Sequence, residues 1–188
     1  MDNVYKELAE TLSEGTEFKL SEESQVLTQR KKVKTPLASM NCILGGGIPF
    51  GSVMMSYGLP KSSKSTFAYQ MMGNFQKDYP DGISLIIDTE ASADGYRLQA
   101  LGVDVSKVLR LTPKSIESGF LSILKIIKNK ENNPKLKDIP VFIIWDTISK
   151  GLATDDASQS RMNAMDRARI IKNYMTPLMD KASNQDII

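Results

Sequence analysis

A short loop after an apolar run has the residue types and the spacing that suit phosphate binding. Residues 57–66 read YGLPKSSKST, so Gly58 is followed six residues later by Lys64 and then by Ser65. In such a loop, backbone N–H groups point at the β-phosphate of a nucleotide, the lysine reaches the β- and γ-phosphates, and the serine hydroxyl ligates Mg²⁺. A helix that begins near Ser63 would direct the positive end of its dipole at the same anion.

The loop departs from the usual phosphate-binding pattern at one position. That pattern, G-x-x-x-x-G-K-[ST], has glycine directly before the lysine, whereas this chain has Ser63. A serine adopts positive φ only at a cost, so Ser63 must either lie at negative φ or be strained. A serine-rich turn that caps an ordinary helix is the alternative interpretation of these residues.

Two later apolar runs end in carboxylates. The run at 85–90, LIIDTE, carries Asp88 and Glu90, and the run at 141–147, VFIIWDT, carries Asp146. Side chains at the carboxyl ends of parallel strands face the ligand crevice of an open sheet. Asp146 is then placed to hold a Mg²⁺ shell through water, and Glu90 to orient or deprotonate an attacking water. Either acid alone could simply end a strand, but their succession after a phosphate loop favours a shared site.

The apolar periodicity predicts strands that alternate with helices. Strands alternating with helices indicate βαβ crossovers and a parallel sheet, so we expect an α/β fold. The expected strands are 53–57, 83–88, 108–111, 140–145 and an incipient strand at 186–188. The expected helices are 2–13, 64–78, 93–101, 114–130 and 164–183.

Composition excludes several classes of chemistry. The chain has 188 residues, enough for one domain with a core, and its net charge of +2 demands no polyelectrolyte partner. Cys42 is the single cysteine, which excludes an intrachain disulfide and suits a reducing cytoplasm. The sequence has no histidine, so Ser-His and Cys-His nucleophiles and an ordinary zinc site are excluded. No apolar stretch approaches the length of a membrane span, so no membrane association is expected.

A glycine-rich segment upstream of the loop resembles a known family. Residues 39–51, SMNCILGGGIPFG, resemble the L-D-x-x-L-G-G-G-[LI]-P-x-G lead-in of RecA/RadA-type recombinases, with Met40-Asn41 in place of Leu-Asp. Three more segments resemble that family's motifs, in the same order: IIDTEASAD at 86–94, LGVD at 101–104 and VFIIWDTISK at 141–150.

The resemblance covers about residues 30–188, and within this family the chain is most similar to the phage branch, the UvsX-like recombinases. The features that carry this finer likeness are the Lys-Ser-x-Lys-Ser loop, its missing glycine and the lead-in KTPLASMN at 34–41. The implied fold is a RecA-like P-loop NTPase core, a parallel sheet flanked by helices. Because the chain stops at the expected strand 186–188, we expect this core to be truncated after its fourth or fifth strand.

The resemblance implies a site for ATP and Mg²⁺. Catalytic roles fall to Glu90 and Lys64, and metal binding to Ser65 and Asp146. Asp94 stands where the family has an adenine-contacting aspartate, whereas the stacking aromatic falls at Tyr96 or Arg97, and Tyr96 as a plain half-buried helix residue is equally compatible. The expected nucleotide-binding residues are Gly58, Lys61, Ser62, Ser63, Lys64, Ser65, Thr66, Asp94 and Tyr96.

Two other segments are expected to serve assembly and DNA binding. By resemblance, residues 1–30 form an N-terminal helix and linker that dock on a neighbouring subunit of a filament, and residues 31–188 form the ATPase core. A helix folded onto its own domain is the alternative for this arm. The loop 150–164 stands where the family has its first DNA-contacting loop, with a surface loop leading into a helix as the alternative. Its expected phosphate contacts are Lys150, Arg161, Arg167 and Arg169.

The expected function is therefore that of an ATP-dependent DNA recombinase, present as its N-terminal portion. By resemblance it would bind single-stranded DNA, form a homo-oligomer or filament and exchange DNA strands. Its expected location is the cytoplasm, which would be the cytoplasm of the host if the chain is phage-encoded. Two alternatives stay open. One is a RecA-fold ATPase of another role, such as a helicase or a ring-forming regulatory ATPase, and the other is a nucleotide-binding assembly module without turnover.

Overall fold

The computed structural model describes residues 30–148, 164–182 and 185–188. The chain divides into two compact units, Met1–Arg30 and Lys31–Ile188, and the description below concerns the second. The helix expected at 2–13 lies outside the described residues, as does most of the expected DNA-contacting loop. Among the helices that the structure describes, none is long and apolar enough to cross a membrane.

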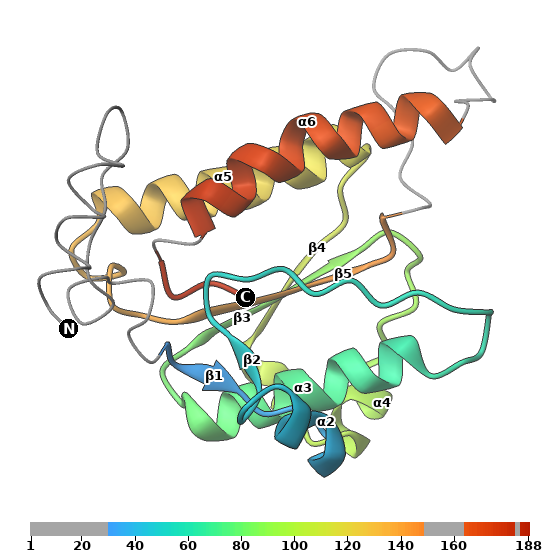
Figure 1. Cartoon of the computed structure of the whole chain (residues 1–188), viewed down its shortest axis with the longest axis vertical. Coiled ribbons are helices and arrows are strands. Elements are labelled where there is room, and N and C mark those ends of the chain that lie inside the picture. The colour runs from blue at the N-terminus through green and yellow to red at the C-terminus, as the bar shows by residue number, and fades with distance from the viewer. Residues whose placement is uncertain (1–29, 149–163, 183–184) are drawn as a thin grey trace, which may run out of the picture. The chain divides into compact units, whose positions relative to one another are not determined.

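Three parallel strands form the central sheet of the second unit. β3 (Ile83–Asp88) lies between β4 (Val108–Leu111) and β5 (Val141–Asp146), and Figure 1 shows this sheet between two layers of helices. β3 is buried over nearly its whole length, which explains its continuous apolar sequence. The structure confirms the α/β fold and the strands expected at 83–88, 108–111 and 140–145.

Helices cover both faces of this sheet, as expected for parallel crossovers. α3 and α4 lie on one face and α5 and α6 on the other (Figure 1). Their bounds are Lys64–Asp78 for α3, Gly95–Ala100 for α4, Ile116–Asn132 for α5 and Ala164–Ala182 for α6. All four helices were expected, and the bounds differ from the expected ones by a few residues at most. A short 3-10 helix, η2 (Val105–Lys107), leads into β4.

The alternation of side chains along β3 divides the core in two. Ile86 packs in the cluster that includes Met72 and Phe75 of α3. Leu85 and Ile87 point to the other face, where α5 and α6 close over them. Because successive side chains of a strand point to opposite faces, each side chain of β3 faces only one of the two layers of helices. Asp88, two residues after Ile86, therefore lies on the face of α3.

A small antiparallel pair precedes the phosphate loop and was not anticipated from the sequence. β1 (Lys32–Val33) pairs with β2 (Ile48–Pro49), and α2 (Ala38–Ile43) lies between them. The Asn41 side chain accepts from the Thr35 N–H at 2.8 Å and donates to the Thr35 carbonyl at 2.9 Å, which closes the connection into α2.

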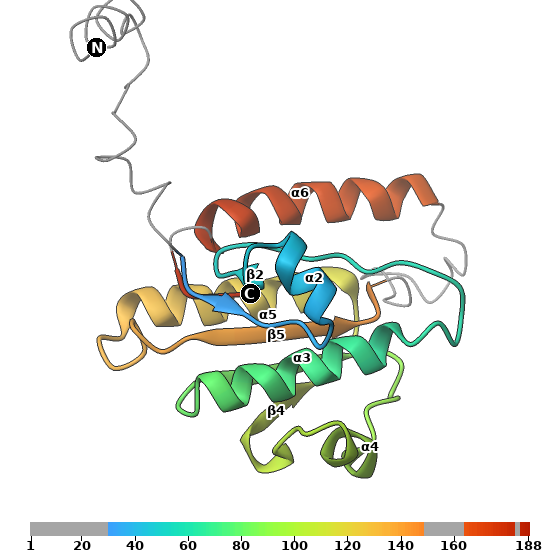
Figure 2. The same cartoon turned by 60° about the horizontal axis from the view of Figure 1, so that its bottom comes forward.

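The expected strand at 53–57 is not a strand in this structure. Its residues are exposed and form no ladder in the described part of the chain. The last backbone hydrogen bond before this segment runs from the Gly51 N–H to the Ile187 carbonyl at 2.7 Å. In Figures 1 and 2 the stretch between β2 and α3 runs past β5. A mostly apolar cavity of about 300 Å³ lies between this stretch, β5 and α6.

We expect Gly119 to be required for the seating of α5 on β5. A Cβ at Gly119 would lie 2.5 Å from the Trp145 ring, so Gly119→Ala should lower the free energy of unfolding by about 1–3 kcal/mol, despite the better helix propensity of alanine. Urea unfolding measures this difference. Gly95→Ala is the matched control, because a Cβ at Gly95 meets no atom within 4 Å. Equal stability of the Gly119 variant and the wild type would contradict this packing.

Candidate nucleotide-binding site

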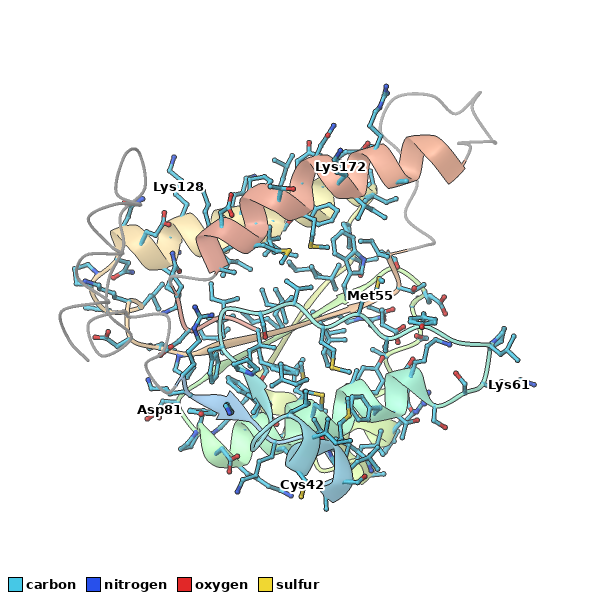
Figure 3. The ribbon with its side chains drawn as sticks, viewed as in Figure 1. Cys42, Met55, Lys61, Asp81, Lys128 and Lys172 are labelled. Carbon is cyan, nitrogen blue, oxygen red and sulfur yellow. The ribbon has the colours of Figure 1, made fainter. Side chains whose placement is uncertain are left out.

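The loop before α3 folds around the Lys64 ammonium group. Lys64 Nζ donates to the carbonyl oxygens of Gly58 at 3.0 Å and Leu59 at 2.9 Å, and to Ser62 Oγ at 3.4 Å. Gly58 has no side chain to obstruct this loop, and a Cβ there would lie 3.0 Å from Ser62 Oγ. Figure 3 shows Lys61 at the outer tip of the loop, directed away from the sheet. A positive group is thus held at the mouth of the loop, where an anion would be attracted.

Ser63 occupies the strained conformation that the sequence left as one of two options. Its φ is 64° and its ψ is 19°, in the left-handed region that suits glycine. Ser63 is the N-cap residue of α3, but its side chain makes no capping hydrogen bond. This geometry does not favour the alternative of an ordinary serine-capped helix, because the side chain supplies none of the usual stabilisation.

The carboxyl ends of β3 and β5 bring two acids to one edge of the sheet. Asp88 and Asp146 are register partners on the neighbouring strands, so both lie at the end of the sheet where a crevice forms in parallel folds. Asp146 is half-buried, and its Oδ2 accepts a hydrogen bond from the Tyr69 hydroxyl of α3 at 3.2 Å. Glu90 follows β3 and is exposed at the same edge. Glu90 and Asp146, the two acids to which the sequence analysis gave roles, thus lie at the same edge of the sheet.

Asp88 organises the loop that carries Glu90. Its side chain is fully buried and accepts from the backbone N–H groups of Glu90 at 3.2 Å and of Ser92 and Ala93 at 3.1 Å. The Arg110 guanidinium of β4 donates to Asp88 Oδ2 at 2.6 Å. A buried carboxylate needs such partners, and here they come from the loop and the next strand. Sequence reasoning missed this role, for which an acid at the end of an apolar run was the only signal.

The hydrogen bonds to Asp88 outweigh the effect of its burial. Burial would by itself raise the pKa of the Asp88 carboxyl, but the N–H groups of Ala93 and Ser92 and the charge of Arg110 hold that pKa below its usual value. Burial and the neighbouring Asp146 charge raise the pKa of the Tyr69 phenol to about 12. At neutral pH the phenol is therefore protonated and available as a hydrogen-bond donor.

The structure brings Arg97, and not Tyr96, to the phosphate-loop helix. Asp94 caps α4 by accepting from the N–H groups of Tyr96 and Arg97, each at 3.3 Å. Arg97 then donates to Thr66 Oγ1 at 2.9 Å, and its guanidinium carbon lies 5.9 Å from the centroid of the Tyr69 ring. The Tyr96 side chain is 84% exposed, which differs from the half-buried alternative. Which residue contacts adenine stays a prediction.

The expected DNA-contacting residues lie mostly beyond the described part. Lys150 and Arg161 are outside the described residues, and the described side chains do not include that of Arg167. Arg169 is exposed on α6. The expected DNA contacts stay a prediction.

The oxygen donors near the loop fit Mg²⁺ that arrives with a nucleotide. Within the described ranges, the structure has no cluster of three or more His, Cys, Asp or Glu side chains arranged to hold a metal ion. Ser65 supplies a hydroxyl and Asp146 a carboxylate, both hard oxygen ligands. Mg²⁺ commonly takes one or two protein oxygens and completes its shell with phosphate oxygens and water, so this donor set suits a shared site.

The fold and the loop together define an α/β protein of the P-loop class. The family model of the RecA N-terminal domain matches residues 1–147. The "Recombination and repair protein" of Enterobacteria phage T4 is 26% identical over 169 residues, which are 87% of this chain and 42% of that protein. Protein RecA of Trichodesmium erythraeum is 29% identical over 129 residues, which are 69% of this chain and 35% of that protein. Protein RecA of Mycoplasma pneumoniae is 32% identical over 102 residues, which are 54% of this chain and 30% of that protein.

The chain belongs to the RecA family. It resembles both the phage T4 recombination protein and bacterial RecA proteins, in agreement with the family inferred from its motifs. The chain spans less than half the length of these relatives. Membership supports a function of the recombinase type.

We expect glycine to relieve the strain at Ser63. Because a left-handed φ costs a serine about 1 kcal/mol relative to glycine, Ser63→Gly should raise the free energy of unfolding by about that amount. Ser62→Gly is the matched control, since Ser62 is not among the described residues with positive φ. At this position glycine adds freedom to the unfolded chain and removes the Ser62 Oγ acceptor that lies 3.4 Å from Lys64 Nζ, so stability should fall slightly. Thermal or urea unfolding distinguishes the two, and a loss of stability in Ser63→Gly would contradict the strain.

We expect the stability contributed by Arg110 to disappear in acid. Because the pKa of Asp88 is lower in the folded than in the unfolded protein, its contribution is present above the unfolded pKa of about 3.9 and is lost as the pH falls through the folded pKa. Arg110→Gln should therefore cost about 1–2 kcal/mol near neutral pH, allowing for the partial exposure of Arg110, and progressively less in acid.

Urea unfolding over a pH series measures this loss. The control is Arg97→Gln, because Arg97 is exposed and bonds to a hydroxyl, not to a carboxylate. Its effect should be small and independent of pH. An Arg110→Gln effect that is the same at all pH values would show that the arginine stabilises by packing alone.

Proposed function

We propose that this chain is the nucleotide-binding portion of an ATP-dependent DNA recombinase. One observation carries the proposal: Lys64, the first residue of α3, donates to a carbonyl of the loop before it, and that helix also contacts Asp146 at the edge where β3 and β5 end. The phage T4 relative is named "Recombination and repair protein", which supports the same role for this chain.

In the proposed mechanism, Lys64 exchanges its bonds to loop carbonyls for bonds to phosphate oxygens. Its ammonium group is already at the loop, so nucleotide binding needs only a small change in its partners. Ser65 and Asp146 would hold Mg²⁺, which neutralises phosphate charge when bound. Glu90 would orient the attacking water, and the bonds from its loop to Asp88 restrict where it lies.

DNA binding and assembly are part of the proposal by resemblance to the family. Single-stranded DNA would meet the basic residues in and just after the loop 150–164, and residues 1–30 would contact a neighbouring subunit. ATP binding between adjacent subunits would then set the geometry of a filament.

A nucleotide-binding module without turnover is the second candidate. The observation that favours it is the unpaired segment 53–57, which leads directly into the phosphate loop. In a P-loop protein the strand before the loop normally holds it in place, and here this backbone support is missing from the described part of the chain. Binding would survive a loosely held loop more readily than hydrolysis, which needs closely defined geometry.

The test is MgATP binding and hydrolysis, with and without single-stranded DNA. Lys64→Ala should weaken ATP binding about tenfold or more, because it removes a charged hydrogen-bond donor to phosphate. Lys128→Ala is the control, since Lys128 is exposed on α5, away from the loop (Figure 3). DNA-stimulated hydrolysis that depends on Lys64 supports the recombinase, and binding without hydrolysis supports the module. Equal binding by both variants would contradict the site itself.

A further inference from the structure

One residue of α3 connects the phosphate-loop helix to Asp146. Tyr69 is four residues after Ser65, so the two side chains lie on the same face of the helix. The Tyr69 side chain is 1% exposed, and its hydroxyl lies 3.2 Å from Asp146 Oδ2. A single helix thus carries the Ser65 hydroxyl and the group that contacts the second expected metal ligand.

We propose that Tyr69 is a positioning residue for the magnesium site: its hydroxyl holds the Asp146 carboxylate in place for the metal. This inference rests on the proposed function, because it assigns a supporting role in the same site. Nothing in the loop pattern or the acidic strand ends selects Tyr69, which lies beyond the phosphate-loop motif.

Asp146 needs a hydrogen-bond donor because of its neighbour across the sheet. It is the register partner of Asp88, and like charges opposite one another on adjacent strands repel. Asp88 is compensated by Arg110 and by three backbone N–H groups. Asp146 accepts from the phenol of Tyr69 instead. The hydroxyl therefore opposes the tendency of this carboxylate to turn away from Asp88.

The phenol ring is itself held in position by Arg97 of α4. The Arg97 guanidinium lies over the Tyr69 ring, at 5.9 Å from its centroid, and also donates to Thr66 Oγ1 at 2.9 Å. Burial of the ring leaves its hydroxyl little freedom to move. The position of Asp146 is thereby coupled to the helix that would receive the phosphates, and the coupling passes through one hydroxyl group.

The experiment compares nucleotide affinity with Mg²⁺ and with EDTA, using a fluorescent ADP analogue. For Tyr69→Phe, which keeps the ring and its packing, we expect the increase in affinity produced by Mg²⁺ to fall about three- to tenfold, as for loss of one hydrogen bond to a charged group. The affinity in EDTA should be unchanged. Tyr79→Phe is the matched control, because the Tyr79 hydroxyl donates to the Lys32 carbonyl at 3.1 Å, away from Asp146, and both affinities should be unchanged.

Two results would overturn the inference while leaving the proposed function intact. In the first, Tyr69→Phe keeps the full Mg²⁺ effect. In the second, it loses as much affinity in EDTA as in Mg²⁺, which would show that the hydroxyl only supports the fold. If the wild-type chain binds the analogue without any Mg²⁺ effect or does not bind it, the proposed function fails, and the role of Tyr69 fails with it.

Discussion

The buried carboxylate of Asp88 is the interaction on which the site depends. A charge at the end of β3 without solvent must be compensated, and its partners are Arg110 of β4 and three N–H groups of the loop 90–93. The same bonds that satisfy the charge also join two strands and shape the loop that carries Glu90. Structural stability and the placement of a catalytic candidate therefore come from one set of contacts.

The parallel sheet extends this arrangement across the molecule. Because β3 and β5 run in the same direction and in register, Asp88 and Asp146 lie side by side on the face covered by α3. The helix that begins at Lys64 packs on this face, so the phosphate loop and the acidic edge share one surface of the sheet. The opposite face is covered by α5 and α6, whose described side chains contribute packing and no group of the candidate nucleotide site.

Local patterns in the sequence were sufficient to predict the strands and helices whose packing partners lie within the described chain. The strand at 83–88 and the helix at 64–78 were predicted with their observed bounds, because burial and helical periodicity are local signals. The prediction of a strand at 53–57 was wrong. An apolar run indicates that a segment can be buried, but a strand also needs a neighbouring strand to pair with. The contacts of Asp88 with Arg110 and of Arg97 with Thr66 join residues distant in sequence, which no spacing in one chain indicates.

The unpaired segment between Gly51 and the phosphate loop affects how the protein behaves in concentrated solution. Met55 is 79% exposed and Tyr57 is 88% exposed. On the edge of β5 that faces away from β3, the residues after Ile143 have no backbone partner among the described residues. Free backbone groups next to exposed apolar side chains are a template for strand addition from another polypeptide. This edge of the sheet, next to the phosphate loop, is therefore a place where a second polypeptide can add a strand and start aggregation.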